Sequence, residues 1–356
     1  HYIDFVPNDE YYEEQWYHQN IQSEDAWEVE QGNESVIIAV IDTGIDLDHE
    51  DLENNLVQGY DFVNLEEFGY EEYCHDNEDC IEEDDNPNDG HGHGTHVSGI
   101  ISSVTDNEIG VSGVCPSCKV MPLRAGWKSV SGGGALLSDD IIQALYYAVD
   151  NNANIISMSF GSYEYSEAEN EAIQNAYDNN IILVAAAGND NTDRIHFPSS
   201  YNNVISVAAT NNEDRRANFS SYGERVDISA PGVDIYSTYL NNNYRTMSGT
   251  SMATPIVAGV FGLVKSYNPE WDNLQVEVQV VGSVDNIYNL NPNYIGKLGA
   301  GRINSNNSIS GQPIPHIFVT FFEDIGEYVQ NETINLSINL KNYGKDALNV
   351  SILVTT

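Results

Sequence analysis

Short apolar runs rich in β-branched residues recur along the first two thirds of the chain, with helix-like stretches between them. The helix-like stretches, such as residues 138–152 and 166–180, carry apolar residues at intervals of three and four. Strands that alternate with helices predict an α/β fold, in which helices cover both faces of a parallel β-sheet. The runs that we assign to strands read SVIIAVIDTG, CKVMPLRAG, ANIISMSFG, NIILVAAAGN and NVISVAAT.

The ends of these runs are the places where we expect functional side chains. In parallel sheets with helical crossovers, binding sites form just beyond the carboxyl ends of the strands. Asp42, Ser159 and Asn189 each lie at or just after the end of an apolar run. These three residues are therefore the first candidates for a site.

The same pattern divides the chain into one large unit and a different carboxy-terminal segment. Residues 1–305 carry the alternating pattern and are predicted to form one domain, interrupted by an acidic, turn-rich insertion at 64–90 that its two cysteines would close. Residues 306–356 form a short all-β segment that alternates like antiparallel strands. Because two or three strands cannot stand alone, we expect them to belong to a β-sandwich. Near the amino terminus, SEDAWEVEQG predicts a helix with Ser23 as its N-cap.

Composition changes this picture mainly through charge. The chain has 55 acidic and 13 basic residues, a formal net charge of −42, and no Lys or Arg before Lys119. Such a chain repels polyanions, which excludes nucleic acid and anionic membranes as partners. No apolar run is long enough to span a membrane. The acidic residues have two interpretations that both stay open, a solubilising surface or carboxylates that hold calcium.

Four cysteines fall as two local pairs, Cys74 with Cys80 and Cys115 with Cys118. An even number at short spacing predicts two disulfide-closed loops in a secreted, extracellular protein. Cys115-Pro-Ser-Cys118 is also compatible with a redox motif or with half of a zinc site. A redox pair usually opens a helix, whereas this pair lies in a loop, and no second Cys-x-x-Cys completes a zinc site. Because the chain starts at His1 without a signal peptide, we expect a mature form.

Three side chains that lie far apart in the sequence have the chemistry of nucleophilic catalysis. Ser251 begins a helical run of small residues, where the helix dipole favours developing negative charge. A serine nucleophile needs a base within hydrogen-bonding reach, and that base needs an orienting carboxylate. His93 also precedes a helical run, and Asp42 ends a strand. Asp, His and Ser in this order are one known arrangement of such a triad.

The segments around these residues, VIDTGID, HGTHVSG and GTSMATPIVAG, resemble the three signature motifs of the subtilisin family of serine proteases. AAAGN is similar to the family's oxyanion segment, and PNDEYYEEQW and GYDFV are similar to segments of its thermitase-like branch. The resemblance covers residues 9–305 and implies a subtilisin-like fold and a serine endopeptidase. One departure is Ile256, where the family usually has His; we expect altered packing under the helix. The catalytic residues that it implies are Ser251 as nucleophile, His93 as general base, Asp42 as its orienting group and Asn189 as oxyanion donor.

The resemblance also implies where a polypeptide substrate binds. The substrate would be clamped between two strands by main-chain hydrogen bonds. We see no fixed charge in the segments that form the walls, which predicts broad specificity with apolar or aromatic P1 residues. His196 aligns near the base of the specificity pocket and modifies that prediction. The implied substrate-binding residues are Gly133, Gly134, Ala135, Leu136, Ser159, Phe160, Gly161, Ala186, Ala187 and Gly188.

Calcium is the cofactor that the resemblance implies, at two or more structural sites. TDNEIGVSG is similar to the family's tight-binding loop, and a plain Asn-containing turn is the alternative. A second site would use the acidic segment IEEDDNPND, which ends the insertion. The first set of ligands is Asp9, Asp51, Thr105, Asn107, Ile109 and Val111, and the second is Asp61, Asp84 and Asn86.

Two other functions fit parts of the sequence. His91, His93 and His96 lie within six positions and suggest a metallohydrolase, whose activity a zinc chelator would stop at once. An acidic, calcium-binding adhesion module with a degenerate protease fold is the non-enzymatic alternative, although such proteins usually lose a triad residue. The leading prediction is a secreted, monomeric, calcium-stabilised serine endopeptidase whose propeptide acts as inhibitor and folding partner.

Overall fold

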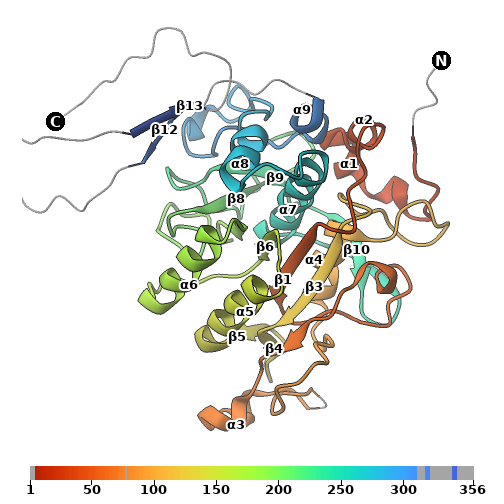
Figure 1. Cartoon of the computed structure of the whole chain (residues 1–356), viewed down its shortest axis with the longest axis vertical. Coiled ribbons are helices and arrows are strands. Elements are labelled where there is room, and N and C mark those ends of the chain that lie inside the picture. Colours follow the sequence, from red (N-terminus) through yellow and green to blue (C-terminus); the bar gives the residue numbers. More distant parts are fainter. Residues whose placement is uncertain (1–4, 77, 311–316, 321–338, 343–356) are drawn as a thin grey trace, which may run out of the picture.

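A seven-stranded parallel sheet forms the centre of the molecule (Figure 1). The structure is a computed structural model that describes residues 5–76, 78–310, 317–320 and 339–342. The strand order is β2-β3-β1-β6-β7-β8-β9, so the chain crosses over between non-adjacent strands. The strands are β1 (Ile37–Asp42), β2 (Tyr60–Asp61), β3 (Lys119–Arg124), β6 (Ile155–Met158), β7 (Ile182–Ala186), β8 (Val204–Thr210) and β9 (Ile228–Pro231).

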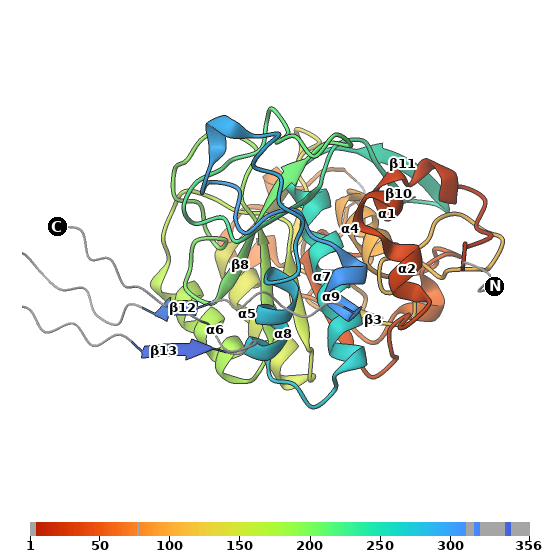
Figure 2. The same ribbon diagram turned by 90° about the horizontal axis from the view of Figure 1, so that it is seen from above.

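Helices cover both faces of this sheet, as the sequence pattern predicts (Figures 1 and 2). Side chains of β1 alternate between the faces: Ile38 and Val40 join one apolar core, and Ala39 and Ile41 join the other. The first core is covered by α4 (His93–Ser102), α7 (Thr250–Tyr267) and α8 (Asn273–Val281). The second core is covered by α5 (Ser138–Asp150) and α6 (Glu167–Asp178).

Smaller elements surround this three-layered body. Three antiparallel pairs join β4 (Gly126–Lys128) to β5 (Gly134–Leu136), β10 (Ile235–Tyr239) to β11 (Asn243–Met247), and β12 (Ile317–Thr320) to β13 (Asn339–Asn342). The short helices are α1 (Trp16–Ile21), α2 (Ser23–Trp27), α3 (Leu65–Phe68) and α9 (Ser305–Ser310), with 3₁₀ turns at Tyr12–Glu14, Glu53–Asn55, Glu71–Tyr73 and Pro292–Tyr294.

The predicted amino-terminal helix differs from the structure in its start and its length. The helix α2 ends at Trp27, and Ser23 is its first residue, not its N-cap. Gln22 precedes it in the left-handed conformation, with φ of 60°, and provides no side-chain cap. The Ser23 hydroxyl instead bonds to Nδ1 of the buried His18 at 3.0 Å. A tertiary contact has thus taken the hydroxyl that local sequence would assign to the helix end.

Both cysteine pairs form disulfides, Cys74 with Cys80 and Cys115 with Cys118. The β-sandwich proposed for residues 306–356 lies mostly outside the described residues. Within them, residues 306–310 belong to the helix α9 and not to a strand, and β12 and β13 pair antiparallel, with Ile317 opposite Asn342. Among the described helices, none combines the length and the apolar character needed to cross a membrane.

Candidate active site

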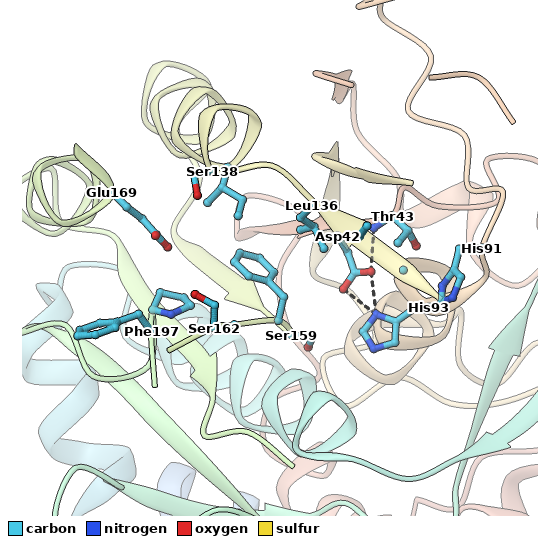
Figure 3. Close-up of a pocket in the computed structure, with 16 residues that line it drawn as sticks. Asp42, Thr43, His91, His93, Leu136, Ser138, Ser159, Ser162, Glu169 and Phe197 are labelled. Atoms are coloured by element: carbon cyan, nitrogen blue, oxygen red, sulfur yellow. Dashed lines mark hydrogen bonds and ion pairs between the residues drawn. The ribbon is translucent and has the colours of Figure 1, made fainter. Parts of the chain in front are cut away.

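The carboxyl end of β1 and the start of α4 bring a carboxylate and an imidazole together (Figure 3). Asp42 is the last residue of β1 and His93 is the first residue of α4. Nδ1 of His93 lies 2.8 Å from Oδ1 and 2.9 Å from Oδ2 of Asp42. This contact fixes the tautomer with the proton on Nδ1, so the lone pair of Nε2 is left to accept another proton.

The surroundings of His93 shift its pKa in favour of the charged ring. Burial by itself lowers the pKa of His93, but the charge and hydrogen bond of Asp42 and the charge of Asp89 outweigh it. The net effect raises the pKa above its ordinary value of 6.5. A ring that becomes cationic readily next to a fixed carboxylate is suited to general-base catalysis.

Asp89, which we did not single out in the sequence, organises the start of α4. Its buried carboxylate accepts hydrogen bonds from the backbone N–H groups of His91, Gly92 and Thr95. It also accepts from the hydroxyl of Thr43, 3.0 Å away, next to Asp42. Asp89 therefore fixes the position of the start of α4 relative to the end of β1. Its place three residues before Gly92, at a helix start, is the sequence signal that could have identified it.

Ser251 is the second residue of α7 and lies against the carboxyl end of β6. Its Oγ donates to the carbonyl of Ser159 at 3.0 Å, and the Ser159 hydroxyl donates back to the Ser251 carbonyl at 2.9 Å. Ser159 lines the same cavity as Asp42 and His93. Among the described residues no hydrogen bond joins Ser251 to His93, so attack requires the serine hydroxyl to rotate away from Ser159.

Asn189 is fixed by the start of the same helix. Its Oδ1 accepts from the N–H and from the hydroxyl of Thr250, at 2.9 and 3.0 Å. The carbonyl side of the amide is therefore occupied, and the two N–H donors of Nδ2 are directed elsewhere. A Cβ placed on Gly249 would lie 3.7 Å from Nδ2 and 3.5 Å from the backbone N of Ser251. Both donors therefore lie at the turn that precedes Ser251.

A cavity of about 400 Å³ extends from Asp42 and His93 along β5 and the end of β6. Figure 3 shows Asp42, His91 and His93 at one end and Glu169, Ser162 and Phe197 at the other. The predicted substrate-binding residues that line it are Gly134, Ala135, Leu136, Ser159, Phe160 and Gly161. Gly133, Ala186, Ala187 and Gly188 do not line it.

His196 fills the space between two of the predicted pocket walls. A Cβ on Gly161 would meet Cε1 of the His196 ring at 2.2 Å, and a Cβ on Gly188 would meet its Nε2 at 3.3 Å. At position 161 only glycine leaves room for the ring, and at position 188 the φ of 101° favours glycine. Burial lowers the pKa of His196, which keeps the imidazole neutral at ordinary pH.

Glu169 is the lining residue that sequence reasoning missed, because we found no fixed charge in the predicted walls. It belongs to α6, is 6 % exposed and lines the end of the cavity remote from His93. The helix periodicity of residues 166–180 places Glu169 on the same side as Ala172 and Ala176. An acidic residue on an apolar helix face is the signal that could have identified it.

The histidine trio does not converge. Nδ1 of His93 faces Asp42, whereas Nε2 of His96 lies 2.9 Å from the backbone carbonyl of Arg245. The rings of His91 and His93 are 6.3 Å apart, centre to centre. Among the described residues, no three His, Cys, Asp or Glu side chains gather as a metal-binding group.

Two buried carboxylates lie together at the first predicted calcium site. Asp9 accepts from the N–H of Asp106 at 2.9 Å, and Asp51 accepts from the amide of Asn107 at 3.0 Å and from the N–H of Val111 at 2.9 Å. No Lys or Arg forms an ion pair with either carboxylate in the described part of the chain. Burial, together with the charge of Asp9, raises the pKa of Asp51 to about 8.

This unneutralised oxygen-rich cluster fits a divalent cation, since Ca²⁺ binds carboxylate and amide oxygens. Nδ2 of Asn107 donates to Asp51 and its Oδ1 accepts from the N–H of Ile109 at 2.8 Å, so the side chain must turn to offer its oxygen to a cation. Thr105 and Ile109, whose backbone carbonyls are the predicted ligands, lie in the same loop as Asn107.

The second predicted calcium set does not fit an ion in the same way. Asp61 and Asp84 pair through their backbones, with N–O distances of 2.9 and 3.2 Å. Oδ2 of Asp61 lies 2.5 Å from Nη1 of the buried Arg124, and its Oδ1 accepts from the N–H of Val63. The Asp84 side chain accepts from the backbone of the exposed Asn86. Arg124, which the sequence analysis did not consider, thus supplies the positive charge at this position.

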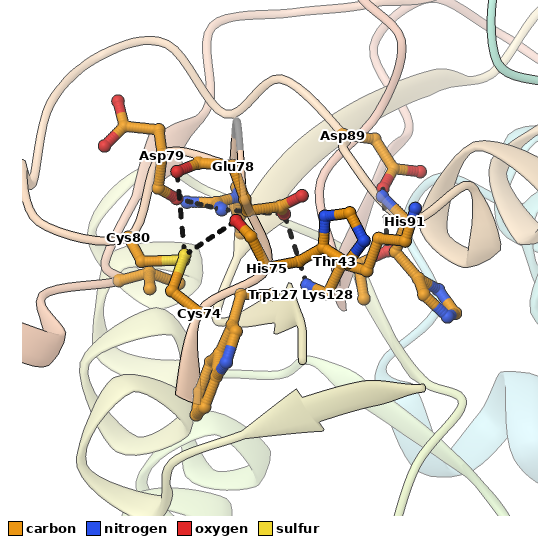
Figure 4. A network of polar contacts seen from close by, with 12 residues as sticks. Thr43, Cys74, His75, Glu78, Asp79, Cys80, Asp89, His91, Trp127 and Lys128 are labelled. Atoms are coloured by element: carbon orange, nitrogen blue, oxygen red, sulfur yellow. Dashed lines mark hydrogen bonds and ion pairs between the residues drawn. A yellow bond between two sulfur atoms is a disulfide. The ribbon is translucent and has the colours of Figure 1, made fainter. Parts of the chain in front are cut away.

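The disulfide-closed insertion packs against the hairpin that carries β5 (Figure 4). The backbone N–H of His75 donates to the carbonyl of Lys128 at 3.0 Å, and Cys74 bridges antiparallel to Ser129. Oε1 of Glu78 accepts from the backbone of Lys128 at 3.2 Å and from Arg124 at 3.1 Å. The insertion therefore supports β4 from the side opposite β5.

Comparison with known proteins agrees with this fold. The model of the Subtilase family (Peptidase S8) matches residues 33–301. A thermophilic serine proteinase from Bacillus sp. (strain AK1) is 38% identical over 307 residues, which cover 86% of this chain and 70% of that protein. Thermitase from Thermoactinomyces vulgaris is 36% identical over 276 residues, 77% of this chain and 91% of that protein.

A solved structure of a protease from Pseudoalteromonas arctica PAMC 21717 has a TM-score of 0.76 and 28% identity, and the match covers 86% of this chain and 99% of that one. The chain belongs to the subtilase family of serine proteases. Its general activity is accordingly that of a subtilisin-like serine endopeptidase acting on polypeptides.

Proposed function

We propose that this protein is a secreted, calcium-stabilised endopeptidase that uses Ser251, His93 and Asp42 as its catalytic triad. The observation that carries the proposal is the two-oxygen contact of Asp42 with Nδ1 of His93. This contact lies in a cavity lined also by Ser159, whose carbonyl accepts the hydroxyl of Ser251.

In the proposed reaction, the hydroxyl of Ser251 leaves Ser159 and attacks the scissile carbonyl carbon. Nε2 of His93 accepts the hydroxyl proton and later passes it to the leaving amine, so that an acyl-enzyme remains on Ser251. Water then repeats the sequence, with His93 again as the base, and releases the acid product. Asp42 keeps the proton of the neutral ring on Nδ1 and stabilises the imidazolium.

Oxyanion stabilisation is assigned to Asn189 and to the backbone N–H of Ser251. The support for this role is that Thr250 occupies Oδ1 of Asn189 and so orients Nδ2 outward. Donors that are fixed before the reaction stabilise the developing charge without reorganising. The start of α7 adds the positive end of an 18-residue helix.

The peptide is proposed to lie as an additional strand between β5 and the segment after β6. Gly133, Gly134, Ala135 and Leu136 would form one edge and Ser159, Phe160 and Gly161 the other, joined to the substrate by main-chain hydrogen bonds. Ala186 and Gly188 would face the P1 side chain. The neutral His196 ring against Gly161 and Gly188 supports a preference for apolar or aromatic P1 residues.

Calcium is proposed at the first site only, held by Asp9, Asp51 and Asn107 with carbonyl groups of the loop at residues 105–111. The ion would neutralise two buried carboxylates and so stabilise the fold. For the set of Asp61, Asp84 and Asn86 we propose no ion. Secretion is supported by the two disulfides. The enzyme is proposed to be a monomer that becomes active when an inhibitory propeptide is removed.

Labelling with a serine-directed phosphonyl or sulfonyl reagent tests the nucleophile. We expect one label, on Ser251, and loss of casein cleavage on labelling. Ser251→Ala should abolish both, whereas Ser248→Ala removes an exposed hydroxyl three residues away and should preserve both. Labelling of another residue, or cleavage by Ser251→Ala at the unmodified rate, would overturn the assignment.

A further inference from the structure

Glu169 occupies a position in the cavity that the catalytic mechanism does not use. Its carboxylate comes from the first turn of α6 and lies with Ser138 and Ser162 at the end of the cavity away from His93 (Figure 3). Among the described residues that line this cavity, none is Lys or Arg. The carboxylate therefore has no cationic partner there.

The local sequence Ser166-Glu-Ala-Glu169 would ordinarily place this carboxylate in a hydrogen bond that caps the helix. In a capping box, the N-cap serine accepts from the N–H of the third helical residue, and the acidic side chain of that residue accepts from the N-cap N–H. The helix α8 forms the complete box, with Asp272 and Gln275. In α6 only half of it forms, since Ser166 accepts from the N–H of Glu169 but donates its own N–H to Tyr201 at 3.0 Å.

The hydroxyl of Tyr201 thus replaces the Glu169 carboxylate at the helix end. Tyr201 has a single hydroxyl proton, and its shorter contact is with the carbonyl of Ser166, at 3.0 Å. Its contact with Oε2 of Glu169 is 3.3 Å. The carboxylate keeps acceptor capacity that no described donor fills. A buried acidic group in this condition is costly unless a partner satisfies it.

The walls near Glu169 suit the apolar stem of a long basic side chain. Ile141, Phe160 and Phe197 line the same cavity, and Figure 3 shows Phe197 at the end where Glu169 lies. Lys and Arg bury their methylene groups against such surfaces while the charged end reaches a polar group. The net charge of −42 gives the whole protein a negative field, the same sign as the Glu169 carboxylate. This field attracts a cationic substrate residue while the substrate diffuses towards the cavity.

The position of this residue in the substrate follows from strand geometry and rests on the proposed function. Side chains of an extended strand alternate between its faces, and residues two apart are about 6.7 Å from each other on one face. P1 faces Ala186 and Gly188, which do not line this cavity. P2 therefore faces His93, which does line it, and P4 lies on the same face, towards Glu169.

We propose that Glu169 makes this enzyme selective for Lys or Arg at P4 of its polypeptide substrates. The basic side chain supplies the hydrogen-bond donors that Glu169 lacks, and the ion pair forms in a largely buried setting. Glu169 acts on recognition of the substrate and takes no part in the chemical step.

The test uses internally quenched peptides that are identical except at P4, with Lys or its uncharged analogue norleucine. In wild-type enzyme at pH 8 we expect kcat/KM to be on the order of tenfold or more higher with Lys, as for a charge-assisted hydrogen bond. Glu169→Gln should reduce this ratio to near one. Glu171→Gln, an exposed change on the same helix, should keep the wild-type ratio.

Two further arms separate local recognition from general attraction. Peptides with the same net charge but with Lys at P3 should show no gain over norleucine at P3. Burial raises the pKa of Glu169, so the Lys preference at P4 should grow as pH rises from 5 to 8 in the wild type and not in Glu169→Gln. A ratio near one in the wild type, or an unchanged ratio in Glu169→Gln, overturns the proposal. Failure to cleave even the norleucine peptides would instead refute the proposed function.

Discussion

The buried ion pair of Arg124 offers a sharp test of what holds the insertion to the catalytic domain. The side chains of Arg124, Asp61 and Glu78 are 1 %, 2 % and 4 % exposed, and the guanidinium contacts both carboxylates. Arg124→Met keeps most of the apolar stem and removes the charge. Two buried carboxylates then lose their cation, a type of change that costs about 3–5 kcal/mol.

The expected shift in melting temperature follows from the size of the domain. Unfolding entropy of about 2.1 cal/mol/K per residue over roughly 300 residues gives about 0.6 kcal/mol/K. The loss of stability in Arg124→Met therefore corresponds to a decrease in melting temperature of about 5–8 °C. The measurement is calorimetry in a Ser251→Ala background, which prevents self-digestion from making unfolding irreversible. Arg215→Met is the matched control, because its pair with Glu213 is 57 % and 70 % exposed, and such pairs contribute at most about 1 kcal/mol.

The loss should also depend on pH. Burial raises the pKa of Asp61 to about 7 even though Arg124 opposes that effect. A carboxyl whose pKa is raised by folding destabilises the fold as pH rises from its unfolded value, near 4, through the folded one. Without Arg124 the pKa rises further, so the deficit of Arg124→Met should widen between pH 5 and pH 8. Equal melting temperatures for Arg124→Met and Arg215→Met would contradict the assigned role of Arg124. So would a loss of stability in Arg124→Met that stays the same from pH 5 to pH 8.

Four other outcomes follow, three from the active site and one from the proposed calcium site. Asn189→Ala should lower kcat by about 10²–10³ with little change in KM, because only the transition state uses the amide; an equal effect on KM alone would argue for a binding role. The raised pKa of His93 predicts that kcat/KM falls as pH drops through a value above 6.5, because the protonated ring cannot act as base. Asp42→Asn should lower kcat by about 10⁴, and retention of the wild-type rate and pH profile would contradict the assigned role of Asp42. In the Ser251→Ala background, calcium at 100 times its Kd should stabilise the fold by about 2.7 kcal/mol. Asp51→Asn should abolish this dependence, while the exposed Asp25→Asn should not; a calcium response that survives Asp51→Asn places the ion elsewhere.

Five of the seven strands, β1, β3, β6, β7 and β8, could be predicted from the sequence because they depend on local pattern, whereas the short strands β2 and β9 were not predicted. The run at residues 35–44 is apolar on both sides, as a buried parallel strand requires, and it became β1. Asp42 could be predicted with it, since the end of such a strand has a fixed place relative to its neighbours. The order of the motifs implied that the end of the strand with Asp42 lies beside the start of the helix with His93. In the structure these two side chains are in contact.

The residues that escaped prediction acquire their roles from partners distant in sequence. Glu169 is turned into the cavity because Tyr201 takes its place at the helix end, 32 positions later. Arg124 lies in a strand that reads as apolar, and its partner Glu78 comes from an insertion without helical or strand periodicity. Ser23 is the exception, since its partner His18 lies only five residues earlier, on the preceding helix α1. Local propensity cannot rank such competing contacts.

The attachment of the Cys74–Cys80 loop to β4 has an evolutionary consequence. Lengthening or recharging this loop would move Lys128 and, through the hairpin register, Gly134 opposite it. His93 and Ser251 are anchored to other elements and would keep their places. Sequence changes in this loop are thus a route by which related enzymes could change their substrate specificity while the catalytic residues stay in place.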